Sequence, residues 1–231
     1  MKKILVTGGD GRFAKVLKKT KSKFIFFFRN KKQLNILSKK SLQLNLNKIK
    51  PHAVLHLAAL SRPMNIHEKN ISKSIQTNIV GTCNLVQELD KRKIKLIYFS
   101  TSYIYPGIKG SYKETDSLLP WNNYGWSKLG GECAVQMYKN SLIIRTSMTE
   151  KPFLHESAYA NVKSNFIFHE DFVKYFLKII NKRGIYNLGG KTQTIYQFAK
   201  RYNKNVNKIY SKGEFPLRMD MDLNKFKKII S

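Results

Sequence analysis

The sequence of 231 residues has few acidic residues, little cysteine and no long apolar run. Its most apolar stretch, residues 24–28, is far shorter than the roughly 20 residues of a membrane-spanning helix, so membrane insertion is excluded. The two cysteines, Cys83 and Cys133, fit no zinc-binding spacing, and no metal site is predicted. Because the N-terminus has no apolar signal region, we expect a reduced, cytoplasmic location.

The shortage of acidic residues leaves a strongly basic chain. Fourteen Asp and Glu stand against 43 Lys and Arg, and the formal net charge is +29. Most of the basic residues are Lys, and Asn and Ile are also abundant, which is typical of codon bias in an AT-rich genome. A basic surface that binds nucleic acid is the alternative. Because the lysines are spread along the whole chain and no nucleic-acid-binding motif is present, we expect no specific nucleic-acid partner, only weak and salt-sensitive binding.

Apolar residues make up 42% of the chain, which is enough for a buried core. Short apolar runs alternate with segments of helical periodicity through residue 145. This order predicts an α/β fold, with a parallel sheet covered by helices on both faces. The predicted strands are 2–7, 24–28, 53–58, 95–100, 141–145 and 184–188. The predicted helices are 13–19, 31–40, 71–91, 122–139, 171–181, 194–203 and 222–230.

A glycine-rich turn follows the first predicted strand and opens the first predicted helix. It reads Thr7-Gly8-Gly9-Asp10-Gly11-Arg12-Phe13-Ala14. Glycine lets the backbone turn tightly and approach a pyrophosphate closely, and the helix N-terminus presents free N–H groups to that anion. In this strand–turn–helix context, the turn predicts a dinucleotide site.

A second motif combines a phenol, an ammonium group and a hydroxyl. Tyr124 and Lys128 are four residues apart at the start of a predicted helix, which places them on one helix face. A nearby cation stabilises a phenolate and lowers the pKa of the phenol toward a range useful for acid–base chemistry. The run Ser100-Thr101-Ser102 ends a predicted strand at the edge where open parallel sheets bind ligands. A hydroxyl there can hydrogen-bond a substrate carbonyl or alcohol oxygen.

Together these elements resemble the extended short-chain dehydrogenase/reductase family. Further stretches are similar to signatures of that family: residues 57–59, 78–82, 125–132, 144–146, 168–173 and 184–190. The resemblance therefore covers nearly the whole chain. It implies a Rossmann-type, doubly wound parallel sheet in residues 1–147, and a small, shortened C-terminal substrate lobe in residues 148–231 that is interleaved with it.

The resemblance also implies roles for individual residues. Tyr124 is the general acid/base, Lys128 is its electrostatic partner and the anchor of the cofactor ribose, and Thr101 orients the substrate oxygen. Asn78 is either close to the cofactor or structural, and the resemblance leaves both roles open. The remaining cofactor residues are Gly8, Gly11, Arg12 and Phe13 at the pyrophosphate, Leu57, Ala58 and Ala59 in the lining loop, and Asn45 and Leu46 beside the adenine.

Within the family, residues 100–107 are most similar to dTDP-4-dehydrorhamnose reductases, although Ser102 stands where that subgroup has Asp. The implied function is NAD(P)-dependent 4-keto reduction of a nucleotide-linked sugar. One alternative is a nucleotide-sugar epimerase of the same family, and another is a non-catalytic Rossmann protein that binds a dinucleotide or RNA. The 4,6-dehydratases of the family have an acidic pair beside the catalytic Thr. Because no carboxylic acid follows Thr101 here, a 4,6-dehydratase is not expected. Residues 146–168, which the resemblance assigns to part of the sugar-nucleotide pocket, are shorter than the same segment in most members of the family. The sequence leaves open the identity of the sugar and whether the chain forms a homodimer.

The end of the second predicted strand bears on the choice of cofactor. NAD-binding members place an acidic side chain there, which accepts hydrogen bonds from the ribose 2′-hydroxyl. This chain has Phe27-Phe28-Arg29-Asn30-Lys31-Lys32, with no acid. Since Arg29 can form paired hydrogen bonds with a 2′-phosphate, NADP(H) is predicted over NAD(H). The alternative is that Arg29 is one more basic residue in a basic chain.

Overall fold

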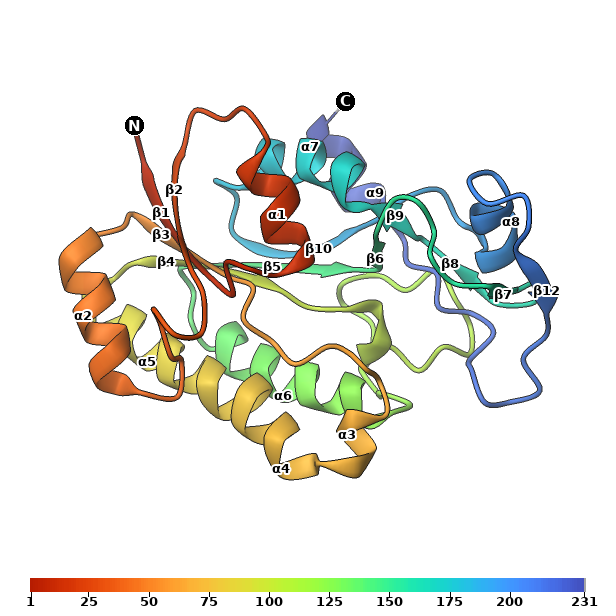
Figure 1. Ribbon diagram of the computed structural model, residues 1–231, viewed down its shortest axis with the longest axis horizontal. Coiled ribbons are helices and arrows are strands. Elements are labelled where there is room, and N and C mark those ends of the chain that lie inside the picture. The colour runs from red at the N-terminus through yellow and green to blue at the C-terminus, as the bar shows by residue number, and fades with distance from the viewer. Residues whose placement is uncertain (231) are drawn as a thin grey trace.

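Six parallel strands form the centre of the protein, in the order β10-β5-β4-β3-β1-β2 (Figure 1). They are β1 (Lys3–Thr7), β2 (Ile25–Arg29), β3 (Ala53–His56), β4 (Lys95–Phe99), β5 (Ser141–Thr146) and β10 (Gly184–Leu188). The computed structural model describes residues 1–230. The predicted α/β class, with its Rossmann-type parallel sheet, is confirmed.

The central residues of the strands are mostly apolar, because helices cover both faces of the sheet (Figure 1). The helices on one face are α1 (Arg12–Lys18), α7 (His169–Ile179) and α9 (Asn224–Ile230), and those on the other are α2 (Lys39–Ile49), α5 (Gly81–Arg92) and α6 (Asn123–Gln136). Val6 and Ile97 pack with the first group, and their neighbours Leu5 and Leu96 pack with the second. Alternate residues of each strand thus contribute to two separate cores.

A smaller lobe lies beyond the carboxyl edge of the sheet, at the right of Figure 1. Its elements are β6 (Met148–Thr149), β7 (Ser157–Tyr159), β8 (Lys163–Ser164), β9 (Ile167–Phe168), β11 (Gln193–Thr194), α8 (Ile195–Lys200) and β12 (Asn207–Ile209). They form the two-stranded pairs β6–β9, β7–β12 and β8–β11 around a core that includes Phe168 and Phe198. β10 and α7 follow residue 147 in the chain but belong to the central layers. The boundary at residue 147, with a C-terminal lobe interleaved with the sheet domain, stays a proposal.

Two predicted helices differ in the structure. The helix predicted at residues 31–40 is wrong, because the chain makes turns through this region and α2 begins at Lys39. Ser38 caps α2 by accepting a hydrogen bond from the Ser41 N–H, and Leu42 then starts the buried face of the helix. The helix predicted at 71–91 is divided. It consists of α4 (Ile71–Ser74), the π-helix η1 (Ile75–Val80) and α5, and the short α3 (Ile66–Lys69) precedes it.

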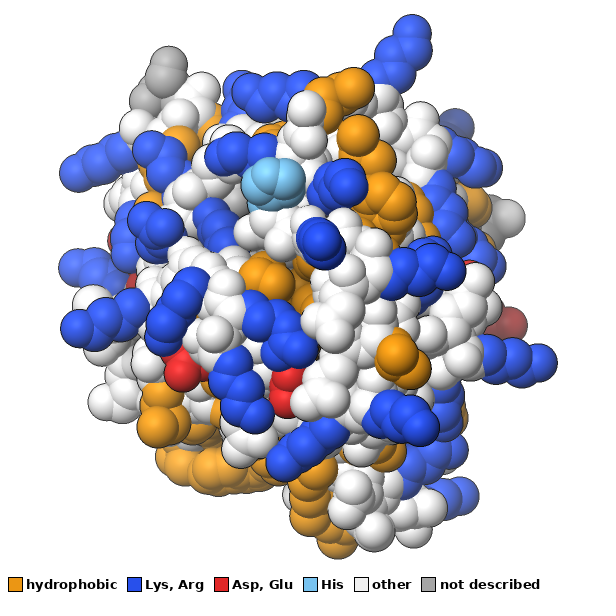
Figure 2. All heavy atoms as spheres, turned by 90° about the vertical axis from the view of Figure 1, so that its left-hand side faces the viewer, with side chains coloured by type: hydrophobic (Ala, Val, Ile, Leu, Met, Phe, Trp, Pro, Cys, Tyr) orange, Lys and Arg blue, Asp and Glu red, His pale blue; other side chains and the backbone are white. Residues whose placement is uncertain are grey.

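Positive charge is spread over the surface. Figure 2 shows Lys and Arg side chains scattered across the face that carries β2 and α2, with few acidic side chains among them. Such a distribution attracts anions at long range without defining a binding groove. Within residues 1–230, no helix is both long and apolar enough to cross a membrane. In the same residues, no group of three or more His, Cys, Asp or Glu side chains is arranged to hold a metal ion.

Candidate active site

The glycine-rich turn lies at the carboxyl edge of the sheet, where β1 has β2 on one side and β3 on the other. Gly8 has a φ of +66°, and a Cβ added there would lie 2.7 Å from the backbone nitrogen of Ala58. A Cβ at Gly9 would lie 2.8 Å from the backbone nitrogen of Arg29. Glycine is needed at both positions because the turn packs directly on the end of β2 and on the loop that follows β3. The fold thus brings the turn, Arg29 and the predicted lining loop together at the carboxyl edge of the sheet, and this region is called the crevice below.

Buried hydrogen bonds fix the lining loop to the end of β1. Thr7 Oγ1 accepts hydrogen bonds from the backbone N–H groups of Leu57 at 3.2 Å and Ala58 at 3.1 Å. It also lies 2.8 Å from His56 Nδ1, and His56 Nε2 lies 3.1 Å from Thr82 Oγ1. Burial lowers the pKa of His56 to about 3, so the ring is neutral. The imidazole is therefore a structural bridge between β1 and α5.

Asn78 connects the same loop to the helix that carries the predicted catalytic pair. Its Oδ1 accepts a hydrogen bond from Leu60 N at 2.8 Å, and its Nδ2 donates to Leu60 O at 2.9 Å and to Ser127 Oγ at 2.8 Å. Ser127 Oγ in turn donates to Tyr124 O at 2.8 Å. Because protein partners occupy both ends of the amide, the geometry supports the structural role of the two roles left open for Asn78.

Tyr124 and Lys128 lie in the first two turns of α6. Asn122 sets the start of this helix by accepting a hydrogen bond from Gly125 N at 2.8 Å. A Cβ at Gly125 would clash with the carbonyl oxygen of Tyr103, so the start of α6 lies directly against the 3₁₀ turn η2 (Ser102–Ile104). Thr101 caps η2. This close approach brings the predicted hydroxyl to the predicted phenol.

Burial sets the ionisation of the pair. It raises the pKa of the Tyr124 phenol, whereas a hydrogen bond with Thr101 and the charges of Arg12 and Arg62 act in the opposite direction. Burial lowers the pKa of Lys128 to about 7, and the Glu132 carboxylate opposes this effect. The phenol is therefore protonated at neutral pH, and the lysine is close to its midpoint.

Several polar groups beside the pair have no partner. The Lys128 ammonium lies 4.1 Å from the centre of the Tyr98 ring, and no hydrogen bond to it is formed by the described part of the chain. In the same residues, the buried hydroxyls of Ser100 and Thr146, at the ends of β4 and β5, are also unpartnered. Ser102 differs, because its Oγ lies 2.6 Å from Ser147 Oγ. The unpartnered groups sit where the carboxyl edge of the sheet meets α6.

Arg29 lies at the end of β2, as predicted, but its neighbours differ from the prediction. Asn45 does not present a free amide, because its Oδ1 accepts from Arg29 Nε at 3.2 Å and its Nδ2 donates to the carbonyl oxygens of Gln33 and Ser41. Leu46 is 2% exposed and packs in the core, so its side chain offers little surface to an adenine. The reason is the position of α2, which starts at Lys39 and places both residues inside a helix.

The remaining predicted cofactor residues divide into two groups. Leu57, Ala58 and Ala59 keep accessible surface along the crevice, and Gly11 is exposed at the start of α1. Phe13 is buried, with its ring 5.1 Å from that of Phe99, so its side chain belongs to the core. Only the backbone at position 13 is left to face a ligand.

Two charged residues that the sequence analysis missed lie at the mouth of the crevice. Glu150 Oε1 lies 2.8 Å from Arg12 Nη1, and Glu150 Oε2 lies 3.6 Å from Arg62 Nη1. Burial tends to raise the pKa of Glu150, but the hydrogen bond and charge of Arg12 and the charge of Arg62 bring it below its usual value. No local motif signals this cluster, because its members are far apart in the sequence.

Aromatic side chains line the side of Tyr124 that faces the smaller lobe. The ring of Tyr103 lies 5.6 Å from Tyr124 and 5.3 Å from Trp121, and Trp121 lies 4.8 Å from Phe215. These rings are half-buried. The indole N–H of Trp121 is buried and has no hydrogen-bond partner within residues 1–230.

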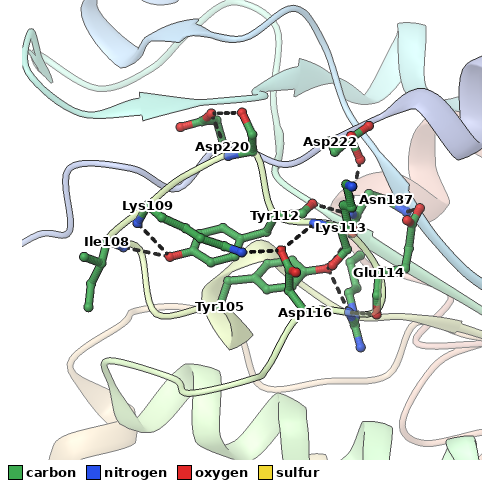
Figure 3. A network of polar contacts seen from close by, with 12 residues as sticks. Tyr105, Ile108, Lys109, Tyr112, Lys113, Glu114, Asp116, Asn187, Asp220 and Asp222 are labelled. Carbon is green, nitrogen blue, oxygen red and sulfur yellow. Dashed lines mark hydrogen bonds and ion pairs between the residues drawn. The ribbon is translucent and has the colours of Figure 1, made fainter.

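A buried polar network holds the loop that follows η2 (Figure 3). Asn187 of β10 donates through Nδ2 to the carbonyl oxygens of Tyr112 at 2.8 Å and Asp222 at 3.2 Å, and its Oδ1 accepts from the Tyr105 hydroxyl at 2.9 Å. The rings of Tyr105 and Tyr112 stack with their centres 4.8 Å apart. Arg145 Nη1 donates to the same Tyr105 hydroxyl at 2.8 Å. The network joins β5, β10, the loop and the C-terminal segment.

Comparison with known proteins places this geometry in a family. A family model described as the RmlD substrate binding domain matches residues 1–166. A dTDP-4-dehydrorhamnose reductase of Aggregatibacter actinomycetemcomitans is 28% identical over 154 residues, which are 64% of this chain and 52% of that protein. A methionine adenosyltransferase 2 subunit beta of Pongo abelii is 34% identical over 103 residues, which are 45% of this chain and 30% of that protein. The chain thus spans about a third to a half of the length of these curated relatives.

Solved structures share the fold. The dTDP-4-dehydrorhamnose reductase from Bacillus anthracis, in complex with NADP, superposes with a TM-score of 0.88 at 22% identity, covering 98% of this chain and 91% of that one. WbmH from Bordetella bronchiseptica, in complex with NAD⁺, superposes with a TM-score of 0.76 at 15% identity, covering 99% and 91%. Because the family model spans well over half of the sequence and the fold agrees along its length, the chain belongs to the RmlD substrate binding domain family.

Proposed function

We propose that the protein is an NAD(P)-dependent oxidoreductase that reduces the 4-keto group of a nucleotide-linked sugar. The observation that carries the proposal is the hydrogen bond between Thr101 and Tyr124, with Lys128 one turn further along α6. The charge of Arg12, which follows the glycine-rich turn, also acts on this phenol. A module that only binds a dinucleotide has no need for a protonated phenol next to a lysine whose pKa is about 7.

The residues present fit a dinucleotide. The turn at Gly8 and Gly9 leaves no room for a Cβ against the loops of β2 and β3, and Lys128 keeps its hydrogen-bond donors free. Gly8 and Gly11 would hold the pyrophosphate, Lys128 the ribose next to the nicotinamide, and the accessible loop residues 57–59 the nicotinamide side of the crevice. When bound, the reduced nicotinamide supplies a hydride to the substrate carbonyl.

The protein's own residues handle the proton. Thr101 orients the substrate oxygen by hydrogen bonding, and Tyr124 donates its phenolic proton to that oxygen as the carbonyl is reduced. A raised pKa suits this direction, because a proton donor must be protonated at neutral pH. Lys128 stabilises the phenolate that remains.

We assign NADP(H) as the preferred cofactor. Arg29 Nε is held by Asn45, and Arg29 Nη1 donates to Phe28 O at 3.1 Å. Within the described residues Nη2 forms no hydrogen bond, which supports a role in binding a 2′-phosphate beside the adenosine ribose. The loop 30–38, which follows β2 at the same edge, replaces Leu46 as our candidate for the adenine side of the crevice.

We assign the half-buried aromatic side chains Tyr103, Trp121 and Phe215 to the sugar nucleotide. Their faces suit stacking against a nucleobase or a sugar ring, and the unpartnered Trp121 N–H suits an oxygen acceptor. These residues join η2 and the start of α6 to the smaller lobe, so a ligand stacked on them reaches Tyr124.

We also propose that the chain forms a homodimer through the outer face of α4, η1 and α6. Ile71, Ile75 and Trp126 are exposed there around a hollow of about 430 Å³. Figure 2 shows hydrophobic side chains gathered at its lower edge, where Figure 1 shows α4 and α6. Light scattering should give twice the monomer mass, and Ile75→Asp should return the monomer without loss of fold. A wild-type monomer would refute the dimer.

The test of the proposed function is turnover. Purified protein is mixed with NADPH and a dTDP-4-keto-6-deoxyhexose, and the loss of NADPH absorbance is followed together with the product. Reduction of the ketone that disappears in Tyr124→Phe supports the proposal. A sugar epimer formed without net consumption of NADPH would favour the epimerase instead.

Binding of NADPH without any turnover would favour a second candidate, a non-catalytic binding protein. The similarity to proteins named as a subunit of methionine adenosyltransferase favours this candidate. In that case the Tyr124→Phe variant would bind NADPH with the same affinity as the wild type, and neither protein would show turnover.

A further inference from the structure

Glu150 joins two arginines across the mouth of the crevice. Arg12 is the first residue of α1, directly after the glycine-rich turn. Arg62 comes from the loop after β3, and Glu150 comes from the segment after β6. One carboxylate oxygen lies 2.8 Å from Arg12 Nη1 and the other lies 3.6 Å from Arg62 Nη1. A single carboxylate thus connects the start of α1 with the loop after β3.

The cluster is open to exchange. The side chains of Arg12, Arg62 and Glu150 are 38%, 41% and 23% exposed, so solvent and ligands reach all three. Ion pairs this exposed contribute little to stability, and bracing the fold is therefore a weak explanation for them. Within residues 1–230, Glu150 is the only carboxylate paired with either arginine.

The surrounding charge favours a more strongly anionic partner than one carboxylate. Two guanidinium groups face one carboxylate, which leaves the cluster with a net charge of +1. Burial and the charges of the arginines lower the pKa values of the neighbouring His155 and His169 rings, so both rings are neutral at neutral pH. The positive charge of the cluster therefore comes from the two arginines. Guanidinium groups bind phosphate oxygens through paired, charge-assisted hydrogen bonds.

We propose that the diphosphate of a bound nucleotide replaces the Glu150 carboxylate on Arg12 and Arg62. Glu150 is then an internal competitor that holds both arginines in place until a ligand arrives. A diphosphate reaches this site from two sources, the dinucleotide cofactor and the sugar nucleotide. The identity of the source rests on the proposed function, whereas the exchange itself rests on the ion pairs.

The experiment measures binding rather than turnover. Dissociation constants are determined for NADPH by fluorescence, and for dTDP and inorganic pyrophosphate by calorimetry. The variants are Glu150→Gln and Arg62→Ala. Asp90→Asn is the matched control, because it removes one exposed, lysine-paired carboxylate from the end of α5, next to the amino end of β4. Thermal melts confirm that each variant is folded.

Glu150→Gln should tighten the binding of pyrophosphate and of at least one nucleotide by about 2- to 5-fold, since the ligand no longer displaces a charged competitor. Arg62→Ala should weaken the same ligand, and Asp90→Asn should change nothing. A change in NADPH binding identifies the cofactor as the source, and a change in dTDP binding identifies the sugar nucleotide. If Glu150→Gln leaves all three ligands unchanged, or weakens them, the exchange is refuted.

The two proposals fail in different ways. Wild-type protein that binds neither NADPH nor dTDP would contradict the proposed function. Pyrophosphate would still decide the exchange in that case, because its response to Glu150→Gln does not depend on which nucleotide the protein uses.

Discussion

Removal of Arg145 should be among the most damaging single changes outside the crevice. Arg145 is 1% exposed and Glu132 is 0% exposed, and Glu132 Oε1 accepts from Arg145 Nε at 3.0 Å and from Nη2 at 2.6 Å. Gln136 also donates to Oε1, whereas Oε2 has no partner within residues 1–230. Arg145→Met would therefore leave a buried carboxylate without its counterion, which typically costs about 3–5 kcal/mol of unfolding free energy.

A double variant shows whether the loss of stability comes from the unpaired Glu132 carboxylate. The double variant Arg145→Met with Glu132→Gln removes both charges, and replacement of a whole buried pair is often close to neutral. We therefore expect the double variant to recover at least half of the lost free energy. Asp171→Asn is the control, because it breaks an exposed pair with Lys174 and should change stability by less than about 1 kcal/mol.

Urea unfolding followed by circular dichroism gives the unfolding free energies. A stable domain has about 5–15 kcal/mol, so the single variant should unfold at a much lower urea concentration or be partly unfolded without urea. If Arg145→Met loses less than about 1 kcal/mol, or if the double variant is less stable than the single one, the reasoning from the buried pair is wrong.

Three further predictions concern the crevice. Tyr124→Phe should keep NADPH binding, measured by fluorescence, and lose about 10²- to 10⁴-fold in kcat, since it removes the proton donor; a variant within threefold of wild type would contradict this role. NADPH should exceed NADH by at least about tenfold in kcat/KM, and Arg29→Ala should remove most of that margin because a 2′-phosphate loses its paired hydrogen bonds. Lys128 has a folded pKa lowered from 10.5 to about 7. The unfolded chain therefore binds more protons between about pH 7 and 10.5, so stability should rise with pH in this window, and urea midpoints should show a smaller rise in Lys128→Met.

The central sheet could be predicted from the sequence because each strand is a short run of apolar residues. Helices cover both faces, so the strand at residues 141–145 is buried along its whole length and its three central residues are all apolar. The glycine-rich turn was recognisable for a similar reason, since its role depends on backbone conformation at consecutive positions. Such patterns are local in the sequence, so they can be recognised without knowledge of the tertiary structure.

Features that depend on distant contacts could not be predicted. The pairing of Glu150 with Arg12 and Arg62 joins three segments that are far apart in the sequence, and no motif marks Arg62 or Glu150. The start of α2 is set by the Ser38 cap and by the fit of Leu42 against the core. The burial of Leu46 follows from this start and was not visible in the sequence.

The network around Asn187 bears on the order in which the protein is completed during synthesis. The loop after η2 forms backbone hydrogen bonds with the last part of the chain, from Tyr112 N to Asp220 O at 3.1 Å and from Asp222 N to Tyr112 O at 2.8 Å. A nascent chain that ends before residue 220 already contains every strand of the central sheet, but it lacks these partners for the loop. The loop after η2 can therefore be fastened only after residues 220–222 have been translated. The glycine-rich turn and its neighbouring strands can form earlier than the fixed position of this loop.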